Sequence, residues 1–188
     1  MTDLKSKISN LKHTLDNLIF LKTEINTAIK LGYKTLKNNK NIYICGNGGS
    51  AAQAQHLAAE FLVRLRPKVN RKPFAAISLA QDVSTITACG NDYNFNEIFS
   101  RNLEALGKKN DLLISISTSG NSKNIIKVLK TAKKNNIKTL TLLGNDGGKA
   151  KGISDLDIIL KEKNVARVQE AQIFLGHYIF EKVEDLLI

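Results

Sequence analysis

The sequence predicts an α/β fold: a doubly wound, five-stranded parallel sheet flanked by helices and preceded by an N-terminal helical pair. Short apolar runs of strand length alternate along the chain with longer segments of helical periodicity. Two of these runs end in loops of small residues that lead directly into a predicted helix. Alternating strands and helices favour a parallel sheet with right-handed crossovers, which binds ligands at the carboxyl ends of its strands.

At 188 residues the chain has the length of a single domain, residues 1–188. We divide it into N-terminal helices for oligomer packing (1–39) and an α/β core (40–188). Residues 3–39 contain no proline and have apolar residues at helical spacing, which predicts two helices with a break near Lys22 and Thr23. Their apolar stripe would pack against a neighbouring subunit or against the chain's own sheet.

The elements of the core follow from apolar runs and from turn and capping residues. The predicted strands are 41–45, 74–79, 111–117, 138–143 and 156–160. The predicted helices are 51–64, 81–89, 94–106, one that opens after Ser122, and 164–187. Residues 90–92 are predicted to form a turn, and Asn94 with Glu97 a capping box at the start of the third of these helices.

Composition and charge narrow the range of partners. The net charge is +11, but the lysines are spread through every segment, whereas a nucleic-acid footprint needs clustered charge and usually arginine. We therefore expect a basic surface that attracts anionic small molecules, and no nucleic-acid partner. Cys45 and Cys89 do not form a disulfide framework. No apolar run is long enough for a signal peptide or a membrane span, so we expect a cytoplasmic protein without a membrane partner.

Small-residue loops follow the first and third predicted strands, at residues 46–50 and 117–122. A loop that opens a helix presents free N–H groups and the positive end of the helix dipole to an anion. Neither loop has the spacing of a dinucleotide or P-loop site, which argues against nucleotide binding. The two loops together favour a phosphorylated ligand. We assign its phosphate to the hydroxyl groups of Ser117, Thr118, Ser119 and Ser122.

A possible acid/base or metal site involves two of the predicted helices. His56 and Glu60 are four residues apart and share one helix face, as an ordinary surface pair would also do. The last helix carries Gln169 and His177, about 12 Å apart along its axis, so both reach one ion only if their side chains lean together or a second subunit contributes. Such a set suits zinc, and a carboxylate with an imidazole suits proton transfer next to a carbonyl.

The chain resembles the sugar isomerase (SIS) domain family and, within it, the phosphoheptose isomerases. The resemblance covers essentially the whole chain and rests on the runs CGNGGSAAQAQHLAAEF, GNDYNFNEIFSR, SISTSGNS, NDGGK and ARVQEAQIFLGH. It implies the SIS fold and an aldose-ketose isomerase that converts D-sedoheptulose 7-phosphate to D-glycero-D-manno-heptose 7-phosphate through a cis-enediolate. This reaction is the first step of ADP-heptose biosynthesis, which serves lipopolysaccharide or capsule.

The resemblance also implies roles for individual residues. Glu60 and His177 match the acid/base pair, and one Zn²⁺ per subunit would be held by His56, Glu60, Gln169 and His177. The implied substrate-binding positions are Asn47, Gly48, Gly49, Ser50, Glu60, Asn91, Asp92, Ser117, Thr118, Ser119, Ser122 and Gln169. The family is homotetrameric, with sites built between subunits. Gln172 stands where some members have histidine, and Val63 stands where glycine is frequent. Whether Glu60 is the base, a metal ligand or both stays open.

Two alternatives have different functions. A non-catalytic SIS protein that binds a replication initiator or senses a phosphosugar would keep the two loops and lose the catalytic pair. Retention of His56, Glu60, Gln169 and His177 favours the enzyme, whereas the high positive charge slightly favours this alternative. An isomerase for another phosphosugar is a third possibility, because the serine loop reads the phosphate and not the length of the sugar chain.

Overall fold

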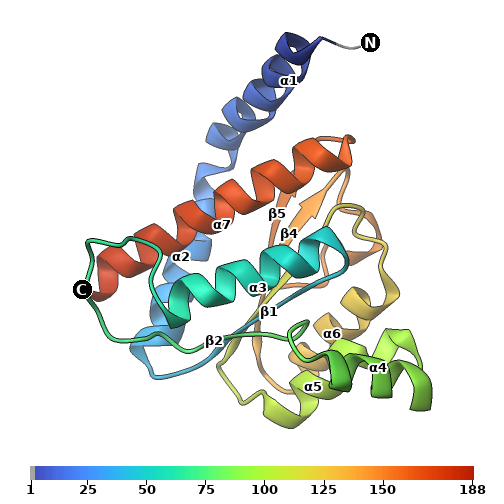
Figure 1. Cartoon of the computed structure of the whole chain (residues 1–188). Coiled ribbons are helices and arrows are strands. Elements are labelled where there is room, and N and C mark those ends of the chain that lie inside the picture. The colour runs from blue at the N-terminus through green and yellow to red at the C-terminus, as the bar shows by residue number, and fades with distance from the viewer. Residues whose placement is uncertain (1–2) are drawn as a thin grey trace.

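The computed structural model describes residues 3–188, and within them five parallel strands form one sheet between two layers of helices (Figure 1). The strand order is β2-β1-β3-β4-β5. The strands are β1 (Ile42–Gly46), β2 (Ala76–Ser78), β3 (Leu112–Ser117), β4 (Lys138–Gly144) and β5 (Leu156–Leu160). The predicted fold class is confirmed.

The helices agree with the prediction except around residues 90–97. They are α1 (Leu4–Asp16), α2 (Lys22–Lys37), α3 (Gly49–Leu62), α4 (Val83–Asp92), α5 (Ile98–Leu106), α6 (Lys123–Lys134) and α7 (Val165–Leu187). Short 3₁₀ helices lie at Asn17–Leu21, Phe95–Glu97 and Gly148–Ala150.

The turn predicted at residues 90–92 is wrong, because these residues form the last turn of α4. Gly90 does not adopt the positive φ for which a turn needs glycine. The predicted capping box is also wrong. Asn94 caps the short 3₁₀ helix by accepting a hydrogen bond from the Asn96 amide, whereas the carboxylate of Glu97 bonds Ser100 and Lys127.

The two faces of the sheet pack against different helices. In β1, Ile42 and Ile44 pack with α2, α3 and α7, while Tyr43 and Cys45 pack with α4, α5 and α6. Side chains alternate along a strand, so a strand buried on both faces is apolar at consecutive positions. This double burial explains why the strands are continuous apolar runs in the sequence.

The N-terminal region divides into a packed helix and a projecting one. Ile25, Ala28 and Ile29 of α2 belong to the same buried cluster as the first face of the sheet. In contrast, α1 projects beyond the body of the molecule and leaves Leu4 and Ile8 exposed (Figure 1). The predicted break between the two helices is a 3₁₀ helix that ends at Leu21. Among residues 3–188, none of the helices combines the length and the apolar character that crossing a membrane requires.

The strand order places a topological switch point between β1 and β3. From β1 the chain crosses to β2 on one side and then returns to β3 on the other side. The helices that follow β1 and β3 therefore lie on opposite faces of the sheet, which opens a crevice at the carboxyl ends of these strands. The two small-residue loops begin there.

Candidate functional site

The glycine loop (46–50) and the serine loop (117–122) start side by side at the same edge of the sheet. Gly46, the last residue of β1, pairs with Ile116, the next-to-last residue of β3. Asn47 of the glycine loop and Asn124, in the first turn of α6 after the serine loop, form reciprocal amide hydrogen bonds of 2.8 and 2.9 Å. The N-termini of α3 and α6 consequently open onto one crevice, as anion binding by two helix N-termini requires.

The serine loop has a fixed shape. The amide of Gly120 donates to Ser117 Oγ at 3.0 Å, and the amide of Asn121 donates to Ser119 Oγ at 3.2 Å. Gly120 has a φ of +63°, and a Cβ atom at this position would lie 1.9 Å from the carbonyl oxygen of Gly147. Only glycine fits there. Ser117 is buried inside the turn, whereas Thr118 and Ser122 are half-buried and Ser119 is exposed.

A second group of polar side chains lies farther along α3. The acid/base cluster consists of His56 and Glu60 on α3 and His177 on α7. His56 Nε2 lies 2.8 Å from His177 Nε2 and 3.4 Å from Glu60 Oε1. One nitrogen or oxygen atom from each of the three side chains lies within 4.8 Å of the other two. His56 and His177 are 121 positions apart in the chain and meet because α3 and α7 pack together.

Close packing of α3 and α7 brings the two histidines together. A Cβ atom on Gly176 would lie 2.7 Å from both methyl groups of Leu57, so only glycine allows this approach. One turn farther along, the rings of Phe61 and Phe180 stack with centroids 3.7 Å apart. The two helices run parallel, and His177 therefore faces His56.

The surroundings of His177 favour its neutral form. Burial lowers the pKa of this imidazole, and the positive charge of a protonated His56 would lower it further. The carboxylates of Glu60 and Glu181 act in the opposite direction. A neutral imidazole can accept a proton or bind a metal ion through its free nitrogen.

The remaining predicted site residues lie outside the cluster. Gln169 is two turns before His177, and its side-chain amide packs against Gly49 of the glycine loop. Its backbone carbonyl accepts a hydrogen bond from Gln53 at 2.7 Å. Asn91 and Asp92 lie at the exposed end of α4, where the amide of Asn91 donates to the carboxylate of Asp92. Hence the structure brings Gln169 to the glycine loop but shows no bond between either loop and residues 91–92 in the part of the chain it describes.

Comparison with known proteins identifies the family. A model of the SIS domain matches residues 8–144. A phosphoheptose isomerase of Helicobacter pylori is 48% identical over 164 residues, which cover 87% of this chain and 84% of that protein. The chain belongs to the phosphoheptose isomerase family. This confirms the resemblance seen in the sequence.

The fold of the phosphoheptose isomerase family extends over nearly the entire chain. The structure of a phosphoheptose isomerase from Neisseria gonorrhoeae matches with a TM-score of 0.89 at 35% identity and covers 97% of both chains. The Vibrio vulnificus NanR protein complexed with ManNAc-6P has a TM-score of 0.68 at 16% identity, covering 100% of this chain and 63% of that one. At this identity the second likeness shows the fold alone.

The acid/base cluster fits the metal ion that the family resemblance implies. Two imidazoles and one carboxylate within 4.8 Å correspond to the three protein ligands of a catalytic zinc site, which keeps a further position open. The fourth implied ligand, Gln169, packs against Gly49 and would have to turn its side chain toward His177.

Three residues that sequence reasoning missed shape the site. Asn124 bonds Asn47 across the crevice, and its position in the first turn of α6 was the available signal. Arg71 and Glu184 form a buried ion pair beside the end of α3. A glutamate at a buried position of a mostly apolar helix face was a signal for Glu184. Arg71 lies in a loop and gives no such signal.

Proposed function

We propose that the protein is an aldose-ketose isomerase that converts D-sedoheptulose 7-phosphate into D-glycero-D-manno-heptose 7-phosphate, the first step of ADP-heptose biosynthesis. The observation that carries this proposal is the acid/base cluster, in which Glu60 and His177 lie together on two helices that begin near the phosphate-binding loops. Relatives named phosphoheptose isomerase, 48% and 35% identical to this chain, support it.

The two loops and the cluster would bind opposite ends of one substrate. The phosphate would be held by the hydroxyls of Ser117, Thr118, Ser119 and Ser122 together with the amides at the N-termini of α3 and α6, and the Ser117 hydroxyl also keeps the loop in shape by accepting a hydrogen bond from the Gly120 amide. Asn47, Gly48, Gly49, Ser50, Asn91, Asp92 and Gln169 are the further proposed substrate-binding residues.

The separation of the two ends favours a long phosphosugar. Glu60 lies eleven residues after Gly49, which is about 16 Å of helix axis. Helical side chains lean toward the N-terminus, so the carboxylate reaches back toward the loops. An extended chain gains roughly 1.2 Å per bond, and the bonds from phosphorus to carbon 1 of an open-chain heptose 7-phosphate therefore span roughly 10 Å. A triose phosphate has half as many bonds and spans roughly 5 Å, so it would fill less of this distance.

Catalysis begins with the open-chain ketose. Glu60 removes a proton from carbon 1, which gives a cis-enediolate, and a proton is then delivered to carbon 2. His177, whose neutral form is favoured, moves a proton from the oxygen on carbon 1 to the oxygen on carbon 2. Zinc bound by His56, Glu60, Gln169 and His177, one ion per subunit, would supply positive charge that stabilises the developing oxyanion.

The proposal also covers the location, the oligomeric state and the pathway of the enzyme. It acts as a cytoplasmic homotetramer whose residues 1–39 contribute to oligomer packing around the single domain. Its product feeds lipopolysaccharide or capsule synthesis. The exposed apolar residues of α1, among them Leu4 and Ile8, support the oligomer, because exposed apolar side chains gathered on one helix mark an interface.

The test is direct assay of the purified protein. Incubation with sedoheptulose 7-phosphate should yield the aldose, and a chelator should slow the reaction until zinc is restored. Shorter ketose phosphates serve as the specificity control and should react more slowly. Binding of the phosphosugar without any product, with or without zinc, would contradict the proposal and favour the non-catalytic phosphosugar-binding protein.

A further inference from the structure

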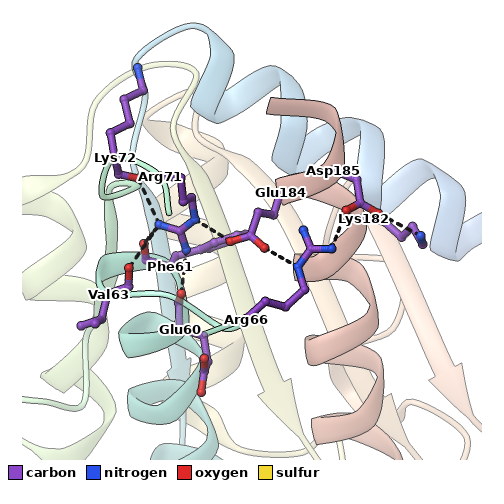
Figure 2. Close-up of polar contacts among 9 residues, drawn as sticks. All are labelled: Glu60, Phe61, Val63, Arg66, Arg71, Lys72, Lys182, Glu184 and Asp185. Atoms are coloured by element: carbon purple, nitrogen blue, oxygen red, sulfur yellow. Dashed lines mark hydrogen bonds and ion pairs between the residues drawn. The ribbon is translucent and has the colours of Figure 1, made fainter. Parts of the chain in front are cut away.

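The end of α3, where Glu60 lies, is held by a buried arginine. The last carbonyl groups of a helix have no partners within the helix. Arg71 supplies these partners: Nη2 donates to the carbonyl oxygen of Glu60 at 2.9 Å, and Nη1 donates to that of Phe61 at 2.9 Å and to that of Val63 at 3.4 Å (Figure 2). The Arg71 side chain is only 2% exposed. Its positive charge also complements the dipole of α3 at this end.

The same arginine connects α3 to the helix that carries His177. Its Nε donates at 2.5 Å to Glu184 of α7, whose side chain is 1% exposed (Figure 2). Glu184 lies seven residues after His177 and hence two turns farther along the same face of α7. Opposite charges buried in contact neutralise each other, whereas either one alone would be costly to bury.

We propose that Arg71 is a positioning residue for the reaction and that Glu184 is its anchor. Its bond to the Glu60 carbonyl fixes the backbone of the base, and the bond to Glu184 fixes this turn of α3 relative to α7. The distance between Glu60 and His177 thus depends on Arg71, although Arg71 touches neither side chain. This inference rests on the proposed function, since it assigns Glu60 the role of the base.

Arg71 acts at the reacting end of the substrate and not at its phosphate. A shift of the base by about 1 Å can lower the rate about a hundredfold. The phosphate-binding loops lie at the other end of α3, where Arg71 makes no contact within the described residues. Loss of Arg71 should therefore reduce kcat more than it raises KM.

The decisive variant is Arg71→Lys, which keeps the charge but replaces the planar fork with one ammonium that cannot bond both carbonyls and Glu184 in the same geometry. We expect kcat to fall about tenfold or more while KM changes less than about threefold. The matched control is Arg66→Gln. Arg66 donates to the same Glu184 carboxylate at 2.6 Å but bonds no carbonyl at the end of α3, so its loss should leave kcat within about twofold of wild type.

Amide hydrogen exchange gives a readout that does not need turnover. In Arg71→Lys the amide of Val63, which donates to the Ala59 carbonyl in the last turn of α3, should exchange faster, while in Arg66→Gln it should not. If Arg71→Lys does not fold, Glu184→Gln tests the same link with the same two readouts.

The two proposals fail in different ways. An inactive wild-type protein defeats the proposed function, and unchanged exchange at Val63 in Arg71→Lys then defeats the positioning role as well. With an active wild type, three results overturn the positioning role alone. Arg71→Lys could keep the wild-type kcat, or Arg66→Gln could lose as much kcat as Arg71→Lys does. The third result is that kcat and KM of Arg71→Lys change in equal proportion.

Discussion

The environment of a single thiol shows how burial changes an ionisable group in this sheet. Cys45 is fully buried in β1, where its Sγ lies 3.3 Å from the hydroxyl of Ser115 on β3. Burial raises the pKa of the Cys45 thiol to about 12, while the contact with Ser115 opposes this shift. The native protein therefore keeps a proton on Cys45 at alkaline pH values at which the unfolded chain has lost it.

This difference predicts how stability changes with pH. A raised pKa in the folded state means that the stability from the protonated thiol is present at neutral pH and is lost as the pH rises above about 9. Between pH 8 and pH 10 the wild type should lose about 1.4 kcal/mol more unfolding free energy than Cys45→Ala. Urea unfolding of both proteins at the two pH values measures this. Equal losses would show that the thiol ionises as freely in the native state as in the unfolded one.

The candidate site could be predicted from the sequence only where its residues are close in the chain. The spacing of His56 and Glu60 places them on one helix face, and their contact of 3.4 Å agrees with this. No spacing indicates that His177 lies against His56, because this contact depends on how α7 packs against α3. Residue type alone made His177 a candidate ligand, and its pairing with Glu60 came from the family resemblance. Arg71 was missed for the same reason, since Glu184 lies 113 positions away.

At the scale of elements, the contact between α3 and α7 determines the geometry of the cluster. Gly176→Ala would place a methyl group 2.7 Å from both methyl groups of Leu57, which is 1% exposed and cannot move aside. The two helices should separate. We expect a loss of about 1–3 kcal/mol in unfolding free energy and a lower kcat, because His177 moves away from His56 and Glu60.

The chain offers a matched control and a rescue for this prediction. Gly90 also lies in a helix, but a Cβ atom there would meet nothing within 4 Å, so Gly90→Ala should keep kcat and stability or gain about 0.4–1 kcal/mol. Adding Leu57→Ala to Gly176→Ala should recover part of the kcat by removing the clash. Thermal melting and steady-state kinetics test both. A Gly176→Ala enzyme as active as wild type would mean that the helix spacing does not control the site.

The elements themselves were predictable where burial is uniform. Strand β3, whose six residues are all buried, was predicted at residues 111–117 and lies at Leu112–Ser117, because a run of mainly apolar residues of this length fits a buried strand. The end of α4 was not predictable, since glycine and asparagine at positions 90 and 91 are typical of turns. In the structure they extend a helix that begins at Val83, after the N-cap residue Asp82, whose side chain accepts a hydrogen bond from the Ser84 amide.

At the scale of the whole molecule, the projecting N-terminal region bears on assembly. Phe20, in the 3₁₀ helix between α1 and α2, is 81% exposed and borders a cavity of about 530 Å³ formed with the residues around the end of β5. If the protein is a homotetramer, Phe20→Glu should dissociate it into smaller species, because a charge would be buried in the interface. Light scattering during gel filtration measures the mass.

The control for assembly is Val83→Glu, at an exposed position on α4 that should not affect the mass. A wild-type protein that is monomeric, or a Phe20→Glu protein of wild-type mass, would count against the proposed role of this region. The sequence alone could not show which of the two N-terminal helices packs on the chain's own sheet and which is left for a neighbouring subunit. Both have apolar stripes, but α2 supplies several buried residues to the cluster, whereas α1 packs only the partly buried Leu15 against it among the described residues.

The central claim is that Glu60 and His177 transfer a proton on one phosphosugar. Isomerisation in D₂O, followed by proton NMR, tests it most directly. The wild type should form the aldose with deuterium at carbon 2, whereas Glu60→Gln should bind the substrate but exchange about 10²–10⁴ times more slowly. Exchange and aldose formation at the same rate in both proteins would contradict the claim.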